Sequence, residues 1–399
     1  MRIAIDVRRE PNSGVGRVAE TLASRLALWL AREHQVDLLA SAPKPEFQGN
    51  PRCVVLDAPP HKQQSSGALN QLLDESRVEL FINPNTTWIP AGATPTINIV
   101  HDTWMLLNPH WMPSLEEFSE RFNVMGDELK AAITEHFEQL DLNRVFTDHG
   151  ARLFRDSQSQ KHQIALMQYA VIVGRSAGVV CVSEKVKQDI LKLYQAPKRI
   201  TVIHNLVENY KSNKPRVPSH FLCLSKLERR KNLELLLEAY RQYYQRSEVA
   251  LPLVIAGTKG YREYRTETLA RIDKMQQEGM KVRYIGPVES QELPDLFSQT
   301  AAVIVTSHAE GFGLPAMEGM LAELPIISTP VGMIGPHVEH YYKVDPGGAE
   351  ASLVDALIEV QNRPPDPQQL KRANHLVSGA FSPENICQQW VDFINHFTP

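Results

Sequence analysis

The sequence predicts an α/β protein of two domains, each with a parallel sheet covered by helices. The chain has 399 residues, more than a single hydrophobic core usually supports. Short apolar segments alternate with segments of helical period in two series, one before residue 208 and one after residue 220. This alternation is typical of βαβ units, whose parallel strands are buried on both faces.

The first series predicts a domain over residues 1–207. Its expected strands are residues 2–7, 36–41, 53–56, 78–83, 96–101 and 178–183, and its clearest helices are 18–33 and 162–175. Residues 113–150, with a helix-like stretch from 115 to 137, form an expected insert. It could be a solvated helical hairpin, part of an acceptor site, a dimer contact or a cover for the sheet.

The second series predicts a domain over residues 221–380, after a linker of polar residues and prolines at 208–220. Its expected strands are residues 221–225, 253–256, 282–285 and 302–306, and its first helix covers 233–243. The last segment, 381–399, has a cap residue, Pro383 in the first turn and apolar residues at helical spacing. We therefore expect a terminal helix.

Composition excludes several classes of function. A hydrophobic fraction of 43% and a net charge of −4 argue for a globular protein that does not bind nucleic acid. The four cysteines are scattered without a CxxC pair, so neither a disulfide framework nor a zinc site is expected. Residues 1–6 read as a strand rather than a signal peptide, and no apolar run is long enough to span a bilayer. These features favour the cytoplasm and leave open peripheral association with the inner membrane surface.

A glycine-rich turn near the C-terminus carries two glutamates. It reads Glu310-Gly311-Phe312-Gly313-Leu314-Pro315-Ala316-Met317-Glu318. The strand before it and the proline suited to a first helical turn predict a strand–turn–helix unit. Its glycines allow backbone amides to approach a ligand, and its helix start favours phosphate. Glu310 belongs to the turn and Glu318 to the helix, so we expect different roles for them. Alternatively, Glu318 only satisfies helix-start amides and Glu310 is a solvated acid.

A basic cluster follows the first strand of the second domain. Lys226 lies just beyond the strand, and Lys231 ends the run Glu228-Arg229-Arg230-Lys231 before the next helix. We expect a pyrophosphate here, because ammonium groups that meet the growing charge of a departing nucleoside diphosphate lower the barrier to its departure. In isolation, such a run could instead be a solvated helix start.

The first domain offers two further candidate ligand contacts. Gly14, Val15 and Gly16 fall in the stretch Gly14-Val15-Gly16-Arg17-Val18-Ala19, which matches a dinucleotide fingerprint of the form G-x-G-x-x-A. Six residues separate it from the first strand, and no acidic residue closes the second strand, so a nicotinamide or flavin enzyme is disfavoured. The loop could offer amides to a diphosphate or sugar, or merely turn the chain. His101 follows a strand and could contact the donor sugar, with Asp102 fixing its tautomer.

The E-G-F-G turn with its second glutamate resembles the signature of the retaining glycosyltransferases of family 4 (glycosyl transferases group 1). This resemblance covers nearly the whole chain and is strongest from residue 221 to 346. It implies the GT-B fold, in which two Rossmann-like domains face an interdomain cleft, with the terminal helix crossing back to the N-terminal domain. Lys226 stands where the family commonly has Arg, and Leu206 stands where it commonly has Gly.

The resemblance also implies roles for individual residues. Glu310 would bind hydroxyls of the donor sugar, Glu318 would bind the ribose, and His101 would face the reacting sugar. Lys226 and Lys231 would bind the diphosphate. The remaining donor contacts would come from backbone groups of Gly14, Val15, Gly16, Gly311, Phe312, Gly313 and Leu314, and the nucleobase would lie on the loops that hold Gly257, Gly286 and Val288.

The implied reaction is transfer of a hexose, with retention, from a nucleotide-diphosphate sugar to a hydroxyl of a glycan or lipid-linked acceptor. No cofactor is expected, and the absence of a D-x-D motif favours a metal-independent enzyme. GDP-mannose is the first guess for the donor, by family analogy alone. A catalytically silent nucleotide-sugar-binding subunit, a nucleotide-sugar epimerase of the same fold and a hydrolase that uses both glutamates remain alternatives. The sequence does not predict the oligomeric state.

Overall fold

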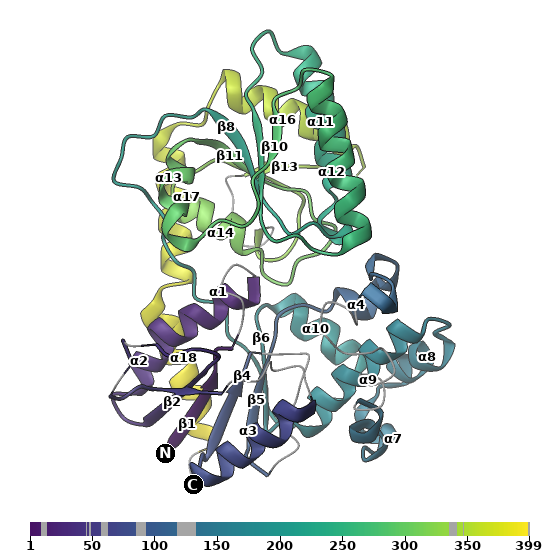
Figure 1. Cartoon of the computed structure of the whole chain (residues 1–399), viewed down its shortest axis with the longest axis vertical. Helices are drawn as coiled ribbons and strands as arrows, with labels where there is room; N and C mark the ends of the chain where they lie inside the picture. The colour runs from purple at the N-terminus through teal and green to yellow at the C-terminus, as the bar shows by residue number, and fades with distance from the viewer. Residues whose placement is uncertain are drawn as a thin grey trace. The chain divides into compact units, whose positions relative to one another are not determined.

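The structure is a computed structural model of the whole chain (Figure 1). It describes residues 1–8, 14–44, 46–47, 49–56, 63–84, 93–117, 133–334, 341–345 and 347–397. The chain divides into two compact units, which we describe separately. Unit 1 comprises residues 1–206 and 383–399, and unit 2 comprises residues 207–382.

Unit 1 contains a sheet of seven parallel strands in the order β3-β2-β1-β4-β5-β6-β7. The strands are β1 (Arg2–Asp6), β2 (Gln35–Ala40), β3 (Arg52–Val55), β4 (Leu80–Asn83), β5 (Thr96–Val100), β6 (Gly178–Cys181) and β7 (Ile200–Val202). Apolar residues fill the central strands, and β4, β5 and β6 are buried along their whole length. Burial on both faces explains why these strands read as continuous apolar runs in the sequence.

Helices cover this sheet. They are α1 (Gly14–Thr21), the π-helical turn η1 (Leu22–Leu26), α2 (Ala27–Leu30), α3 (Gln63–Glu75), α4 (Trp104–Leu107), the 3-10 turn η2 (Pro109–Trp111), α7 (Leu142–Val145), α8 (Asp148–Asp156), α9 (Gln160–Arg175), α10 (Glu184–Leu193), α18 (Pro383–Ile394) and the 3-10 turn η5 (Asn395–Phe397). Ser183 caps α10 as expected, since its hydroxyl accepts the amide of Val186 at 3.3 Å. The terminal helix α18 packs against η1, so the last residues of the chain belong to unit 1.

Unit 2 contains a sheet of six parallel strands in the order β10-β9-β8-β11-β12-β13. The strands are β8 (His220–Leu224), β9 (Leu253–Ala256), β10 (Val282–Tyr284), β11 (Thr300–Val305), β12 (Ile326–Ser328) and β13 (Tyr342–Lys343). The other elements are the 3-10 turn η3 (Arg229–Lys231), α11 (Leu233–Arg246), α12 (Arg262–Gln277), the 3-10 turn η4 (Ser290–Glu292), α13 (Leu293–Ser298), α14 (Leu314–Leu321), α16 (Ala349–Asn362) and α17 (Pro367–Ala380).

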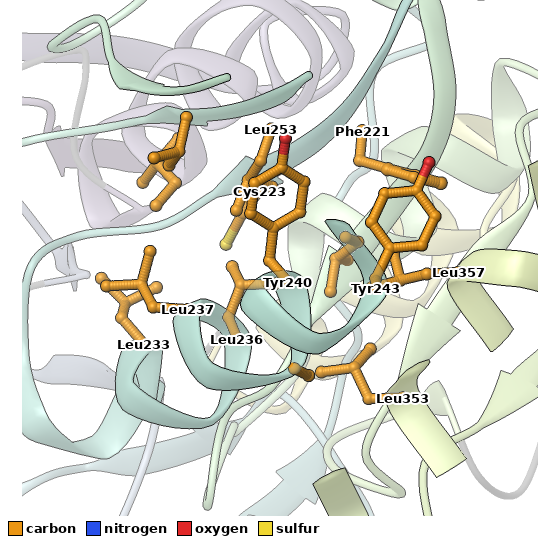
Figure 2. Close-up of a cluster of buried hydrophobic side chains, with 14 of the residues drawn as sticks. Phe221, Cys223, Leu233, Leu236, Leu237, Tyr240, Tyr243, Leu253, Leu353 and Leu357 are labelled. Carbon is orange, nitrogen blue, oxygen red and sulfur yellow. The ribbon is translucent and has the colours of Figure 1, made fainter. Parts of the chain in front are cut away.

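The core of unit 2 lies between its sheet and the helices α11, α12 and α16 (Figure 2). Leu236 and Tyr240 on α11 belong to the same buried cluster as Leu353 and Leu357 on α16, and all four are fully buried. Tyr240 also donates its hydroxyl to the carbonyls of Leu251 and Lys281 at 3.0 Å each, so its polar end is satisfied inside the core. On a separate helix pair, α14 packs against α17.

Both sheets have the strand order of a doubly wound Rossmann fold, with a point at which the order reverses. In unit 1 this switch point lies between β1 and β4, and in unit 2 it lies between β8 and β11. Connections that leave neighbouring strands in opposite directions open a crevice beyond their carboxyl ends, and ligands of such folds bind there. The loops that follow β8 and β11 are therefore the first place to look for a site in unit 2.

Most of the elements expected from the sequence are present, within one or two residues at each end. One correction concerns Gly14, Val15 and Gly16, which we expected in a loop ahead of a helix at 18–33. The structure places them in the first turn of α1. Glycine has a low helix propensity, so a helix that begins at two glycines is not predicted from propensity. The helix can still begin there, because the amides of the first turn need no intrahelical acceptor. Much of the expected insert, residues 118–132, lies outside the described residues, and α7 and the start of α8 form its later part.

Candidate functional site

The loops after β8 and β11 meet at the switch point of unit 2. The first loop carries Lys226 and then the turn η3, and the second carries Ser307 and Glu310. Three hydrogen bonds to main-chain carbonyls connect the two loops. The Thr306 hydroxyl donates to the carbonyl of Lys231 at 3.0 Å, the amide of His308 donates to the carbonyl of Arg230 at 2.8 Å, and Arg230 Nη1 donates to the carbonyl of Ala309 at 3.2 Å. The two loops therefore form one preorganised unit.

Charged side chains on these loops form a continuous chain of ion pairs. Lys226 pairs with Glu228, and Glu228 Oε2 lies 3.2 Å from Arg230 Nε. Arg230 Nη1 lies 3.1 Å from Glu310 Oε2, and the other carboxylate oxygen, Oε1, pairs with Lys231. These five side chains are between 6% and 21% exposed, so solvent screens them only weakly. Three cations and two carboxylates leave one net positive charge at the edge of the sheet.

Glu310 is an ionised carboxylate at any physiological pH. Burial alone would raise the pKa of Glu310, but the charges of Lys231 and Arg230, with hydrogen bonds from Lys231 and Ser307, lower it to about 2. The side chain therefore cannot hold a proton to donate near neutrality, and its lone pairs are committed to cations. This environment suits a hydrogen-bond acceptor and does not suit a general acid.

The oxygens of Glu310 retain room for one further hydrogen bond. Oε1 accepts from Lys231 and from the Ser307 hydroxyl at 2.6 Å, while Oε2 accepts from Arg230. A carboxylate offers about four acceptor sites. Among the described residues, three are occupied. The cavity beside Glu310, lined by Cys223, Lys231, Thr306 and Pro315 among others, has a volume of about 10 Å³, which holds no more than a water molecule. A larger ligand must reach this network from its outer side.

The turn after Glu310 has the predicted form. Gly313 adopts a φ of +93° and caps α14, and Pro315 lies in the first turn of that helix. Phe312 packs edge-on against Phe381 with ring centroids 5.4 Å apart, so its ring is buried and only its backbone can face a ligand. Gly311 is buried and Leu314 is half-buried. Glu318 lies on α14 and is only 2% exposed.

The loops expected to hold a nucleobase are joined to each other. The amide of Gly257 donates to the carbonyl of Gly286 at 2.7 Å, and the Tyr284 hydroxyl donates to the carbonyl of Gly257 at 2.6 Å. A Cβ on Gly257 would lie 2.3 Å from the carbonyl oxygen of Ser225, so only glycine fits there. Ser225 directly precedes Lys226, so this loop abuts the ion-pair chain. Val288 is half-buried farther along the second loop.

In unit 1, the candidate residues follow strands on either side of its switch point. Gly14 and Gly16 lie in the first turn of α1, where amides have no intrahelical acceptor. His101 follows β5, and its Nε2 donates to the carbonyl of Pro84 at 2.7 Å. A carbonyl can only accept, so this bond rather than a bond to Asp102 sets the tautomer of a neutral ring. The backbone carbonyl of Asp102 accepts the Tyr169 hydroxyl at 2.7 Å.

Sequence reasoning missed two members of the ion-pair chain and the serine that donates to it. Glu228 and Arg230 were quoted only as part of a basic run, and Ser307 was not singled out. The sequence around Glu228 offered one signal. Lys226 lies two residues before it and Arg230 two residues after it, so one carboxylate is within reach of both cations.

Two doubly wound parallel sheets, one with a partly buried cationic cluster at its switch point, are typical of α/β proteins that bind nucleotides. Among the described residues, no helix is long and apolar enough to cross a membrane. Within the described ranges, no three histidine, cysteine or acidic side chains come together so that they could hold a metal ion.

Family models identify the chain more closely. The Glycosyltransferase Family 4 model matches residues 12–209, and the Glycosyl transferases group 1 model matches residues 207–376. The chain belongs to glycosyltransferase family 4. The boundary between the two matches falls where the structure passes from unit 1 to unit 2.

Individual relatives match over shorter stretches. The O-antigen chain mannosyltransferase B of Escherichia coli is 31% identical over 110 residues, which is 28% of each chain. The O-antigen chain mannosyltransferase RfbU of Salmonella typhimurium is 27% identical over 208 residues, 51% of this chain and 56% of the relative. The chain thus spans from about a quarter to just over half of the length of these curated relatives.

Solved structures match along nearly the whole chain. Anabaena HepE in complex with UDP and glucose has a TM-score of 0.67 at 15% identity, with 99% of this chain and 100% of that chain covered. Sucrose-phosphate synthase from Thermosynechococcus elongatus has a TM-score of 0.66 at 17% identity, with 99% and 98% covered. At such identities the likeness concerns the fold alone, and it confirms the predicted GT-B fold class.

Proposed function

We propose that this protein is a retaining glycosyltransferase that moves a hexose from a nucleotide-diphosphate sugar to a hydroxyl of a glycan or lipid-linked acceptor, without a metal ion. The observation that carries the proposal is the ion-pair chain from Lys226 to Glu310 at the switch point of unit 2. It combines a net positive charge with low exposure, the combination that favours an anionic diphosphate over water.

The proposed roles follow from the contacts. Lys231 and Lys226 bind the diphosphate and meet the charge that grows on it as the glycosidic bond breaks. Glu310 accepts one hydrogen bond from a donor-sugar hydroxyl, which its remaining acceptor site allows. Glu318 binds the ribose hydroxyls, the loops at Gly257, Gly286 and Val288 hold the base, and amides of residues 311–314 contact sugar and phosphate. Gly14, Val15, Gly16 and His101 contact the donor from unit 1.

The reaction proceeds through an oxocarbenium-like transition state. The departing phosphate oxygen accepts the proton of the acceptor hydroxyl on the same face of the sugar, so configuration is retained without a protein nucleophile. This route depends on neutralisation of the phosphate by fixed cations, and it needs no carboxylic acid. A low pKa for Glu310 is compatible with it and argues against the alternative of a hydrolase that uses Glu310 as its acid.

The proposed donor is GDP-mannose. The support is the similarity to two O-antigen mannosyltransferases, which concerns part of the chain. A uridine nucleotide is the competing choice, because HepE was solved with UDP and with UDP-glucose. The described contacts of the two loops proposed for the base join the loops to each other, through the amide of Gly257, the carbonyl of Gly286 and the Tyr284 hydroxyl, and they favour neither base.

A catalytically silent binding subunit is the second candidate. The observation that favours it is that Lys226 already pairs with Glu228, so the positive charge of Lys226 is partly neutralised before a diphosphate binds. Such a subunit would bind the donor and never turn it over.

A two-stage experiment tests the proposal. First, thermal unfolding is followed with GDP, UDP and ADP, since a ligand that binds only the folded state raises the unfolding midpoint. Then the sugar donors of the stabilising nucleotide are assayed for nucleotide release with a panel of glycan and lipid-linked acceptors, and NMR identifies the anomer of the product.

We expect one nucleotide to stabilise the protein and the product to retain the anomeric configuration of the donor. Stabilisation without acceptor-dependent release would identify the silent subunit. If no nucleoside diphosphate stabilises the protein, the proposed function is wrong.

A further inference from the structure

Glu228 is the junction of the ion-pair chain. It precedes the turn η3, its side chain is 6% exposed, and its two oxygens hold different cations. Oε1 pairs with Lys226, and Oε2 lies 3.2 Å from Arg230 Nε. The backbone of Glu228 is fixed as well, because its amide donates to the carbonyl of Lys226 and its carbonyl accepts the amide of Lys231, each at 2.9 Å.

Arg230 carries the influence of Glu228 across to Glu310. The guanidinium donates from Nε to Glu228, and it donates from Nη1 to both Glu310 Oε2 and the carbonyl of Ala309. A planar guanidinium held at both ends in this way has little rotational freedom. The carboxylate of Glu228 thus contacts Lys226, which is proposed to bind the diphosphate. It is also linked to Glu310, which is proposed to bind the sugar, through the side chain of Arg230.

We propose that Glu228 is a positioning residue that limits the affinity of the site for the nucleoside diphosphate while it holds Arg230 against Glu310. The inference rests on the proposed function, because it concerns the same diphosphate site. Glu228 touches neither the sugar nor the diphosphate in this assignment. It acts through Lys226 and Arg230.

The physical reason is the balance of charge. With Glu228 ionised, the five side chains carry one net positive charge, and without it they carry two. At low exposure, an additional positive charge strengthens binding of the product nucleoside diphosphate more than binding of the sugar donor, because the product carries more negative charge. A tightly held product delays the next turnover. Glu228 therefore keeps the site attractive to a diphosphate and still able to release it.

A structural role alone makes a different prediction. If Glu228 only supports the loop, glutamine should leave nucleotide binding unchanged or weaken it, because its amide oxygen still accepts from Arg230 while its NH2 group cannot accept from Lys226. If Glu228 limits affinity through its charge, glutamine should tighten nucleotide binding and slow turnover. Aspartate keeps the charge but is one methylene shorter, so it cannot reach Lys226 and Arg230 together.

The experiment compares the whole protein with the variants Glu228→Gln and Glu228→Asp. The nucleoside diphosphate that stabilises the wild type is titrated by calorimetry, and kcat and KM for its sugar donor are measured from nucleotide release. Asp295→Asn is the matched control. Asp295 lies on α13 and pairs with Lys214 at 2.7 Å. Helix α13 precedes the first residue of β11, whereas the ion-pair chain follows the last residue of β11. The control therefore makes the same change of net charge at the other end of β11.

We expect Glu228→Gln to bind the nucleoside diphosphate at least threefold more tightly and to lower kcat at least fivefold without raising KM for the donor. Glu228→Asp should keep nucleotide affinity within twofold of the wild type and still lower kcat at least fivefold, a comparison that stands even if the glutamine variant does not fold. Asp295→Asn should match the wild type in both readouts.

If both Glu228 variants keep wild-type affinity and kcat, Glu228 has no positioning role, although the proposed function stands. Weaker binding of the nucleoside diphosphate by Glu228→Gln would also overturn the inference, since it would show that Glu228 strengthens nucleotide binding and does not limit it. If the wild type itself binds no nucleoside diphosphate, the proposed function fails, and the role of Glu228 fails with it.

Discussion

At the scale of single residues, Glu310 shows how burial and charge together fix a chemical role. An isolated buried carboxylate tends to become neutral, because desolvation disfavours its charge. In this protein two cations and a serine hydroxyl more than offset that effect. The result is a carboxylate that stays charged, keeps one orientation and can accept one more hydrogen bond.

The first prediction concerns the two glutamates of the turn. Glu310→Gln removes the charge that holds Lys231 and Arg230 in place, and it should lower kcat by about 100-fold, on the order found when a single preorganised transition-state contact is lost. Glu318→Ala should act mainly through a raised KM for the donor, because the role proposed for Glu318 is to bind the ribose. Steady-state kinetics on folded variants, checked by circular dichroism, measure both effects. Small and equal effects would contradict the assigned roles.

For the ion-pair chain, the sequence predicts which charged residues belong to the site better than it predicts which of them pair with each other. Glu310 and Lys231 could be picked out because one lies in a turn between strand and helix and the other ends a basic run. Their pairing depends on the approach of two loops 79 positions apart, which no local pattern encodes. Glu228 differs, because its partners Lys226 and Arg230 lie only two positions away, and the sequence placed all three together without showing that they pair.

At the scale of elements, α11 connects the site to the core. It begins directly after the basic turn, where Asn232 adopts a left-handed φ of 51°, and its buried face packs on α16. Asparagine tolerates this conformation better than most residues. The basic turn is therefore anchored by a helix whose own position is fixed by packing.

The second prediction tests that packing. Leu236 is fully buried on α11, so Leu236→Ala should lower the free energy of unfolding by about 2 to 5 kcal/mol through lost transfer energy and a cavity. Leu376 on α17 is 46% exposed, and the matched change Leu376→Ala should cost about 0.5 kcal/mol or less. Urea unfolding followed by circular dichroism gives both values. Similar costs at the two positions would show that α11 is not packed as described.

The third prediction concerns the pH dependence of stability. Burial, together with the nearby charge of Arg283, lowers the pKa of His220 on β8 from 6.5 to about 4. Between these values the unfolded chain binds a proton that the folded chain does not, so stability falls as the pH falls, by up to about 1.4 kcal/mol per pH unit. His220→Gln removes this contribution.

The measurement is urea unfolding of the wild type and His220→Gln at pH 7, 6 and 5. The wild type should lose more stability than the variant between pH 7 and pH 5, whatever their difference at pH 7. Parallel curves would mean that His220 is not held neutral by burial.

Two short strands at sheet edges, β7 and β13, were not predicted from the sequence. β7 has three residues and β13 has two, Tyr342 and Lys343, which is too few to establish a period. They form because a neighbouring strand offers unpaired backbone groups, β6 for the first and β12 for the second. Longer buried strands, such as β9 at Leu253–Ala256, were predicted to the residue because burial on both faces makes them uniformly apolar.

At the scale of the whole molecule, two Rossmann-order sheets follow from two series of alternating strands and helices. The sequence could predict this organisation because each unit repeats the same short-range pattern. The assignment of the last residues to unit 1 has a physical basis in the aromatic side chains of Phe393 and Phe397, which lie against Gly178 at the start of β6. A Cβ at Gly178 would fall 2.8 Å from the Phe397 ring.

The central claim is that the cationic cluster of unit 2 binds the diphosphate of a nucleotide sugar, and calorimetric titration tests it most directly. The nucleoside diphosphate and the corresponding nucleoside are each titrated into the wild type, Lys231→Ala and Lys214→Ala, the last being an exposed lysine that also pairs with an acid. We predict that Lys231→Ala weakens binding of the nucleoside diphosphate at least tenfold, that Lys214→Ala does not, and that the nucleoside binds all three proteins equally weakly. Equal affinity of wild type and Lys231→Ala for the nucleoside diphosphate would contradict the account.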